Sequence, residues 1–437
     1  MQKINPREFR IKSRDGKLEE FSETAITTFT YWESILSTSV QATINYVDTG
    51  SRSSQNQSSG TESEGLDIQG TEKIYLSFYD EDNNQLRFNT DVTALRIYNG
   101  NPVLSDTKKE VISFNLCTTE YLKKFYTDFY VTRFYEGKIS DSVNKILKSD
   151  LKTKKPVFID ETSNTLRFYG HVDWTAQDAL LWLSTQSIPN LPSAKGKTAG
   201  YFFYETSEGF KFKSIDVLLG QEAKRTYIYT NTNAIPSGTS SGRKYEKILT
   251  TPIFKSSVNA VDLIKKGAYN SKTYVFDPVY DRVRSVTTDK SDQEKGIKMA
   301  GKSMPDFIDP DLTGTTRINF TTKDLSLLPG VDAKEQLTRS NEENLVVTDI
   351  VNQSQMRYQQ LFAIELSFTI FADLTLHAGD VVECFFPEIS SKATQPTSSK
   401  KSGLYMIVDL CHFISTNGPS YTTLNLVRDS YGRRINK

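Results

Sequence analysis

Cysteine is scarce in this chain of 437 residues, which holds only Cys117, Cys384 and Cys411. The odd number, the wide spacing and the lack of a CxxC pair exclude the disulfide framework of a small secreted protein. They predict instead that the chain is made in a reducing compartment. The same spacing argues against zinc, because zinc ligands come in pairs a few residues apart.

Histidine is equally scarce, with His171, His377 and His412 as the only imidazoles. A metal site can be imagined on the neighbours Cys411 and His412, with Cys384 from a nearby run. Consecutive residues of a strand point to opposite faces, however, so Cys411 and His412 cannot readily share one ligand sphere. We therefore predict that both are structural and that the chain holds no metal.

The sequence also lacks the motifs that mark common catalytic and nucleotide sites. It contains no GxSxG nucleophile turn, no GxxxxGK[ST] phosphate loop and no GxGxxG dinucleotide loop. Carboxylates gather in "YDEDNN" and "DFIDPD", but these are turn sequences, in which Asp and Asn are favoured for backbone reasons. We predict that the protein is not an enzyme and has no catalytic residue and no cofactor.

Net charge is absent too, because 53 Lys and Arg residues balance 53 Asp and Glu residues. This balance excludes nucleic-acid binding through bulk positive charge. No apolar h-region opens the chain, and no apolar run approaches the roughly 18 residues of a membrane span. Neither a signal peptide nor a transmembrane helix is therefore expected.

Aromatic residues, in contrast, are abundant, with 22 Tyr and 25 Phe. In Thr-rich segments with short apolar–polar alternation they predict β-strands. Helical spacing occurs over 139–150 and 173–188, where Ser140 and Thr175 are the predicted N-caps. Residues 200–219 are predicted to form a hairpin with Ser-Glu-Gly at its turn.

Together these segments predict a mainly β fold with α+β modules. Its main parts would be two related antiparallel, tube-like β-barrels, with mixed middle and peripheral domains. The predicted domains are 1–118 for the first barrel, 119–222 for a mixed α/β module, 223–285 together with 346–437 for the second barrel, and 286–345 for a peripheral insertion.

The C-terminal segment carries a recognisable pattern: "AGDVVECFFPE", a polar loop, "SGLYMIVDLCHFIS", a second loop, and "YTTLNLVRDSYG". It resembles the C-terminal barrel of the baseplate central hub proteins of contractile-tailed bacteriophages. That family includes the late-control hub proteins, and its relatives form the upper part of the type VI secretion spike. In the family a Gly-Asp opens a strand, a Gly-x-Tyr strand follows, and a His-bearing stretch leads to a final strand ending in Arg-Asp. The matching positions are Gly379, Asp380, Gly403, Tyr405, His412, Arg428 and Asp429.

Two further blocks extend the resemblance. "FTYWESILSTSVQATINYVDTG" with "LDIQGTEKIYLSFYD" is similar to the N-terminal barrel of the family. "HVDWTAQDALLWLSTQSI" with "GYFFYETSEGFKF" is similar to its middle module, one helix followed by a hairpin. Three blocks in the right order are more specific than any one of them.

The resemblance implies a structural protein of the virion, located in the tail baseplate and assembled in the host cytoplasm. Such hubs form homotrimers whose two barrels alternate around the axis as a pseudo-sixfold ring, which adapts a sixfold tail tube to a threefold spike. The expected partners are the tail spike protein, tail tube or tube-initiator proteins, and baseplate wedge proteins. DNA would pass through the lumen without specific binding, so we expect a weakly charged or net acidic lining, since many basic contacts would slow its exit.

Two other functions stay open. A type VI-like secretion spike component would share much of the fold, but such spikes often carry a long β-helix on the same chain. Here "RRINK" follows soon after the last predicted strand, which favours a separate spike subunit. A glycan-binding or receptor-binding tail protein is favoured only by the carboxylates and by aromatic runs such as "YLKKFYTDFYVTRFY".

Overall fold

The computed structural model describes most of the chain. The described residues are 3–48, 68–105, 109–171, 173–191, 198–230, 246–256, 260–277, 281–289, 297–304, 314–322, 332, 334–335, 338, 347–388, 397–398 and 400–432.

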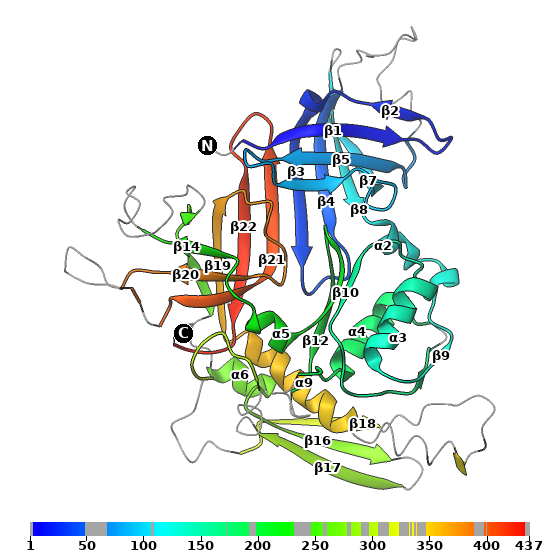
Figure 1. The fold of residues 1–437 in the computed structure, drawn as a ribbon, viewed down its shortest axis with the longest axis vertical. Helices are drawn as coiled ribbons and strands as arrows, with labels where there is room; N and C mark the ends of the chain where they lie inside the picture. The colour runs from blue at the N-terminus through cyan, green and yellow to red at the C-terminus, as the bar shows by residue number, and fades with distance from the viewer. Residues whose placement is uncertain are drawn as a thin grey trace.

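Fourteen strands form one sheet that joins the first and last parts of the chain (Figure 1). Its main path runs β15-β19-β22-β21-β3-β4-β8-β7-β5-β1-β2, while β6 pairs with β5, β20 with β21, and β14 with β20. The strands from the first part are β1 (Asn5–Lys12), β2 (Leu18–Glu20), β3 (Ile26–Ser34), β4 (Gln41–Asp48), β5 (Lys73–Tyr79), β6 (Gln85–Phe88), β7 (Leu95–Ser105) and β8 (Glu110–Cys117). Those from the last part are β14 (Arg225–Ile228), β15 (Ile253–Ser256), β19 (Ile364–Phe371), β20 (Val381–Phe385), β21 (Gly403–Ser415) and β22 (Tyr421–Arg428).

The strands of the sheet alternate buried and accessible side chains. Their buried side chains form two separate apolar cores. On β19 every second residue from Ile364 to Ile370 is buried. The strands of the first part bury one core, which includes Phe9, Phe29 and Tyr46. The strands of the last part bury another, whose members include Ile364, Phe368, Tyr405 and Leu424.

The two parts meet where β21 pairs antiparallel with β3. The register runs from Asp409 opposite Ser34 to Ser415 opposite Thr28. In Figure 1 the orange and red strands β19, β22 and β21 stand beside the blue strands β3 and β4. One continuous sheet therefore connects the segments that the sequence predicted as two barrels.

A mixed module of short strands and helices follows β8. Its helices are α2 (Thr119–Lys123), α3 (Ile139–Lys145), α4 (Ala176–Gln186) and α5 (Ile215–Gly220), with single turns at Thr127–Phe129 and Ile146–Asp150. Its strands are β9 (Phe134–Tyr135), β10 (Val157–Ile159), β11 (Phe168–Tyr169), β12 (Tyr201–Thr206) and β13 (Gly209–Ser214). The predicted hairpin is confirmed as β12–β13, in which Thr206 opposes Gly209.

One predicted helix cap is confirmed and the other is wrong. Helix α4 begins after Thr175, whose side chain accepts a hydrogen bond from the Asp178 N–H at 3.2 Å. Helix α3 begins after Lys138 instead, and Ser140 lies inside its first turn. The Ser140 N–H already donates to Thr162 Oγ1 at 3.0 Å, so a side chain distant in sequence satisfies this helix end.

A second, smaller sheet lies at the lower end of the molecule in Figure 1. It has the order β17-β16-β18, with β16 (Asn270–Asp277), β17 (Arg282–Asp289) and β18 (Arg317–Thr322). Helices α6 (Ala260–Lys266) and α9 (Val347–Leu361) pack against it. The predicted domain boundary between residues 285 and 286 falls inside β17, and the other domain limits stay a prediction.

The whole is a mainly β protein with mixed α/β parts, as the sequence predicts. Within the described ranges, no helix is both long and apolar enough to span a membrane.

Candidate functional site

An extended surface of the main sheet is formed by the accessible side of β19, β22, β21, β3, β4 and β8, which we call the polar face. Cross-strand registers place its side chains in rows, such as Asn425, Asp409 and Ser34, or Thr30, Thr43 and Asn115. Its residues are Glu365, Ser367, Thr369, Phe371, Tyr421, Thr423, Asn425, Asp409, Cys411, Phe413, Ser415, Thr28, Thr30, Trp32, Ser34, Gln41, Thr43, Asn45, Val47, Val111, Ser113 and Asn115.

The polar face is nearly uncharged. At the positions just named the only charges are the carboxylates of Glu365 and Asp409, and neither Lys nor Arg occurs. Many of its hydroxyl and amide groups bond to one another, as Thr43 Oγ1 does to Asn115 Oδ1 at 2.9 Å. Basic residues lie at its margin, where Lys255 of β15 comes within 3.5 Å of Asn425 Oδ1.

Strand β21, inside this face, and strand β7, at its border, change pairing partners in corresponding ways. β21 pairs with β20 through Gly403–Met406, shifts register between Ile407 and Asp409, and then pairs with β3. β7 pairs with β5 at its first residues and shifts register between Ile97 and Asn99. Beyond that shift, no described strand pairs with the edge of β7 that faces away from β8.

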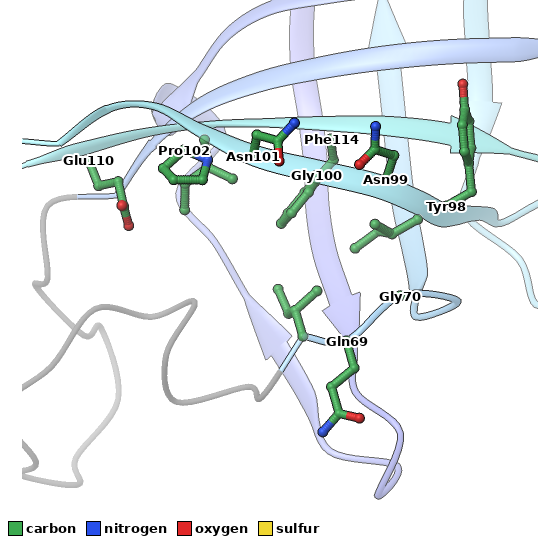
Figure 2. Close-up of a pocket in the computed structure, with 12 residues that line it drawn as sticks. Gln69, Gly70, Tyr98, Asn99, Gly100, Asn101, Pro102, Glu110 and Phe114 are labelled. Atoms are coloured by element: carbon green, nitrogen blue, oxygen red, sulfur yellow. The ribbon is translucent and has the colours of Figure 1, made fainter.

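A pocket of about 420 Å³ lies along this edge of β7. Figure 2 shows Gln69 and Gly70 on one side of it and Pro102 and Phe114 on the other. Among the residues that line the pocket, Glu110 is the only titratable group besides Tyr98, so the lining offers no nucleophile with an adjacent base.

Three clusters of buried charge lie behind these surfaces, each where separate parts of the chain meet. The first centres on Glu33 of β3, whose carboxylate is fully buried. It accepts hydrogen bonds from Tyr31 Oη and the Ser207 N–H at 2.8 Å each, and from the Ala378 N–H at 3.0 Å. His377 Nδ1 lies 3.2 Å from Glu33 Oε1, so β3, the β12–β13 turn and the segment before β20 converge on one carboxylate.

The ion pair determines how both partners titrate. Burial by itself raises the pKa of Glu33, but the charge of His377 and the hydrogen bonds outweigh burial and bring this pKa to about 2. Burial likewise lowers the pKa of His377, but Glu33 outweighs it, with Glu208 Oε1 at 3.5 Å from Nε2, and the net pKa is raised. Each partner thus stabilises the charged form of the other.

The second cluster joins the N-terminal strands to the mixed module. Lys155 Nζ lies 2.6 Å from Glu205 Oε1 and 3.1 Å from Glu120 Oε2, and all three side chains are buried. Thr118 Oγ1 and the Val40 N–H also donate to Glu205, at 3.0 and 3.3 Å. Burial raises the pKa of Glu205, whereas Lys155 outweighs burial at Glu120 and lowers its pKa.

The third cluster ties helix α9 to the end of β22. Arg357 is buried and donates from Nη1 to Asp429 Oδ2 at 2.7 Å and from Nη2 to the Lys298 carbonyl at 2.6 Å. Its Nη2 also lies 3.5 Å from Asp216 Oδ1 on α5. All three clusters are paired and hydrogen-bonded, which is the pattern of structural contacts that fix the orientation of neighbouring parts.

No protein-family model and no curated protein sequence matches the chain. Its fold matches that of a tail protein from Neisseria meningitidis MC58, with a TM-score of 0.52 and 9% identity over 98% of this chain and 97% of that one. It also matches the 43 kDa tail protein of prophage MuSo2 from Shewanella oneidensis, with a TM-score of 0.50 and 9% identity over 97% and 98% of the two chains. The chain has the fold of a phage tail protein. At this identity the likeness concerns the fold alone, and it confirms the resemblance at that level.

Within the tail-protein fold, the predicted motif residues lie at several separate places. Gly379 has φ +89°, and a Cβ atom there would come within 2.2 Å of Tyr204 Oη, so only glycine fits. Asp380 Oδ2 accepts hydrogen bonds from the His377 N–H and from Lys224 Nζ, both at 2.8 Å. These two residues hold the turn that leads into β20.

Gly403, Tyr405 and Arg428 lie together at the start of β21 and the end of β22. The Arg428 guanidinium lies 4.8 Å above the Tyr405 ring. It donates to the carbonyls of Ser402 and Lys400 at 3.1 and 2.6 Å. Both side chains are buried, so this cation–π pair stabilises the C-terminal core.

His412 and Cys411 point to opposite faces of β21, as the sequence predicts. His412 is buried, with Nδ1 2.8 Å from Thr422 Oγ1, and burial lowers its pKa to about 4. Cys411 lies on the polar face, where partial burial raises its pKa to about 11. The described residues contain no group of three potential ligands that could hold a metal ion.

The buried charges are not among the residues predicted from the sequence, although the pattern of β3 contains a signal. Glu33 continues the buried series of Phe29 and Tyr31 at a spacing of two, so strand alternation places a carboxylate in the core. Glu205 likewise follows Tyr201 and Phe203 on β12. A charged residue at a strand position where alternation places buried side chains indicates that its partner is buried beside it.

Proposed function

We propose that the chain is the structural hub of a contractile phage tail baseplate. Three copies form a pseudo-sixfold ring that adapts a sixfold tail tube to a threefold spike and encloses part of the DNA conduit. The observation that carries this proposal is the correspondence between β21 and β7. After its register shift β21 pairs with β3 of the same chain, and β7 would pair in the same way with an edge strand of the next copy.

The correspondence supplies a register for the contact between copies. Asp409 on β21 and Asn99 on β7 both follow the register shift, and Phe413 on β21 opposes Thr30 on β3. The equivalent of β3 in the last part of the chain is β15, the edge strand beside β19. When β7 is paired with β15 of the next copy in the register in which β21 pairs with β3, Val103 lies near Ile253 of that copy.

Both residues are suited to such a contact. Val103 is 65% exposed and Ile253 is 63% exposed, which is unfavourable for apolar side chains on free strand edges. Pairing β7 with β15 of the next copy would close a ring from three identical chains, since a repeated head-to-tail contact closes when its rotation allows. The pocket along β7 would then seat the incoming strand.

The polar face supports the conduit part of the proposal. In a closed ring it would line the lumen, and its near-neutral, slightly acidic character matches what the passage of a polyanion needs. DNA would then pass without specific binding. We propose no reaction for the protein; its partners would be the spike, the tail tube or tube-initiator proteins, and wedge proteins.

Disulfide trapping tests the ring. Val103→Cys combined with Ile253→Cys should form covalent trimers on mild oxidation, visible on a non-reducing gel. The matched control is Val103→Cys with Val261→Cys, since Val261 is 60% exposed but lies on α6 and not on β15. Trapping that is equal in both pairs, or a native mass that is not a multiple of three chains, would reject the ring.

A type VI-like secretion spike component would use the same ring. Electron microscopy of the particles that contain the chain separates the two functions, because only a phage hub lies beneath a tail tube that leads to a capsid. Binding to host polysaccharide, tested with purified protein, would favour a glycan-binding or receptor-binding role.

A further inference from the structure

Five lysines surround the turn that ends the helical segment after α3. They are Lys123 of α2, Lys145 of α3, Lys148 of the turn Ile146–Asp150, and Lys152 and Lys154 just beyond that turn. We call these five residues the lysine cluster. Lys123 is half-buried and the other four are exposed. Figure 1 shows α2 and α3 in the mixed module, on the right of the molecule.

Specific contacts hold three of the five ammonium groups over this turn. Lys123 Nζ donates to the Lys152 carbonyl at 3.1 Å, and Lys148 Nζ donates to the Lys155 carbonyl at 3.0 Å. The Phe129 ring centroid lies 5.0 Å from Lys123 Nζ and 5.5 Å from Lys152 Nζ. The ring therefore attracts two ammonium groups to one place.

The lysine cluster has no counter-charge of its own. In the part of the chain that the structure describes, no carboxylate forms an ion pair with any of its five members. Glu120 and Asp150 are buried, and each pairs with another cation. Asp128 and Asp141 are exposed and make no ion pair. The positive charge of the cluster is thus left to be met from outside.

This arrangement is unfavourable for the chain alone. Burial lowers the pKa of Lys123, and the charges of Lys152 and Lys154 lower it further. Lys152 also has φ +51°, in the left-handed region that favours glycine. Like charges gathered at a strained backbone position indicate a site for an anionic partner rather than a solvated surface.

The size of the lysine cluster favours a short acidic segment over nucleic acid. Lys145, Lys148 and Lys152 recur at helical intervals of three and four residues, so they follow one side of the segment for about 10 Å. A nucleic acid carries its charge along a longer track, and its binding relies on many phosphate contacts. The chain as a whole has no positive excess to supply them.

Two exposed aromatic side chains adjoin the lysine cluster. Phe125 is 66% exposed and Tyr126 is 58% exposed. The Tyr126 N–H donates to the Lys123 carbonyl at 3.1 Å, and Phe125 meets Tyr121 edge to face with ring centroids 5.6 Å apart. Aromatic side chains are enriched where proteins contact one another, with polar and charged groups around them. A polypeptide partner would therefore carry apolar side chains among its carboxylates.

We propose that the lysine cluster, together with Phe125 and Tyr126, docks an acidic segment of a different protein. Carboxylates of that segment meet the ammonium groups, and its apolar side chains meet the two rings. A second copy that presented the same surface would bring lysine against lysine. The inference does not depend on the proposed hub function, and it assigns a role to the stretch "YLKKFYTDFY", which the hub leaves without one.

Fluorescence anisotropy with the purified full chain tests the chemistry. The probe is a labelled peptide of about twelve residues, in which glutamates surround one phenylalanine. We expect binding that weakens as salt rises, because exposed charges are screened. Lys152→Glu with Lys154→Glu should weaken binding at least about tenfold. Lys265→Glu with Lys266→Glu, an equal charge change at exposed positions of α6, should change it less than about twofold.

Thermal unfolding separates docking from a structural role. Reversing two unpaired charges relieves like-charge repulsion, so Lys152→Glu with Lys154→Glu should keep the wild-type Tm within about 2 °C. Lys145→Gln with Lys154→Gln is the second variant, since neither residue contacts Phe129, and it should also weaken peptide binding at unchanged Tm. Weakened binding that always accompanies a lower Tm would overturn the proposal.

Photocrosslinking identifies the partner. A p-benzoylphenylalanine replaces Tyr126 in the full chain, expressed in the cells that naturally make it. The control position is Tyr169 of β11, which is 43% exposed in the same module. We expect a crosslink specific to position 126, mapped to a segment of another protein that is rich in Asp and Glu. Lys152→Glu with Lys154→Glu should lower its yield at least about tenfold.

The other outcomes contradict the proposal. Tighter binding of a single-stranded oligonucleotide of about twelve nucleotides, or of vesicles that contain phosphatidylglycerol, would assign the lysine cluster to nucleic acid or to a lipid surface. A crosslink to a second copy, or to a segment without acidic residues, would assign it to another occupant. Absence of peptide binding, or equal crosslinking at positions 126 and 169, would show that no acidic segment docks there.

Discussion

At the scale of single residues, the charges in the interior are concentrated where parts of the chain meet. Glu33, Lys155 and Arg357 each bind groups from at least two distant segments. A buried ion pair adds little net stability compared with apolar packing, but removing one partner leaves an uncompensated charge. These residues therefore determine how the parts are oriented more than how well each part folds.

The Glu33–His377 pair predicts a loss of stability at alkaline pH. The pKa of His377 in the folded protein lies above its ordinary value of 6.5, so the pair contributes fully below pH 6.5 and is lost as the pH rises through the folded pKa. Glu33, with a pKa of about 2, stays ionised throughout this range. Urea unfolding between pH 6 and pH 9 should show a falling free energy of unfolding.

The variants His377→Gln and His171→Gln test the assignment. His377→Gln should remove this alkaline decrease, whereas His171→Gln, at an exposed position, should keep it. An unchanged alkaline slope in His377→Gln would contradict the assignment. His412 contributes in the opposite sense: because its pKa is lowered to about 4, it reduces stability as the pH falls from 6.5 toward 4.

Lys155→Met should be strongly destabilising, because it leaves Glu120 and Glu205 buried without their cation. We expect a loss of about 3–5 kcal/mol in the free energy of unfolding, measured with denaturant. Lys154→Met is the matched control at an exposed neighbouring position and should change it by less than about 0.5 kcal/mol. Equal effects in the two variants would show that the cluster is not the cause.

At the scale of elements, both local sequence signals and tertiary contacts determine where strands and helices begin, end and change partners. β7 and β21 each change partner at a register shift, which lets one long strand serve two neighbours. Helix α4 starts at a local cap, whereas α3 starts with help from Thr162. The first kind of boundary can be seen in the sequence and the second cannot.

Thr175→Ala should therefore destabilise the protein through helix α4 alone. Loss of the N-cap hydrogen bond typically costs about 1 kcal/mol. Thr185→Ala is the control in the last turn of the same helix, where the hydroxyl bonds the Trp182 carbonyl at 2.8 Å and caps nothing. Thermal unfolding should give a clearly lower Tm for Thr175→Ala than for Thr185→Ala; the reverse order would contradict the capping role.

At the scale of the whole molecule, the continuous sheet decides what surface the protein presents. Two apolar cores lie behind one face, and that face is almost free of charge although the chain carries 53 basic and 53 acidic residues. The charges of the chain are thus placed elsewhere. This separation is the feature that a conduit for a polyanion requires.

Adding positive charge to the polar face tests the proposed conduit, because in the proposed ring it should impair DNA passage without harming the fold. Thr30→Lys with Thr423→Lys would place six cations in a three-chain ring, and counterion release would make DNA adhere. We expect infectivity to fall at least about tenfold while the Tm and the native mass stay unchanged. The neutral pair Thr30→Gln with Thr423→Gln should behave as wild type; equal infectivity of the Lys and Gln pairs would contradict a lumen position for this face.

The sequence predicts the main strands of the first and last parts of the chain, because side-chain alternation with a period of two is a local pattern. It also determined the cap of α4 and the opposite directions of Cys411 and His412. The motif residues were predicted as a set, but only the fold shows that they stabilise several separate turns and cores.

The pairing of β3 with β21, which joins residues more than 370 positions apart, depends on tertiary contacts. The continuation of β17 across residue 285 and the contact between Glu33 and His377 depend on them as well. A local pattern states which face of a strand is buried, but it does not state which distant strand lies beside it. That choice depends on sheet twist, on loop closure and on the few buried charges that must find their partners.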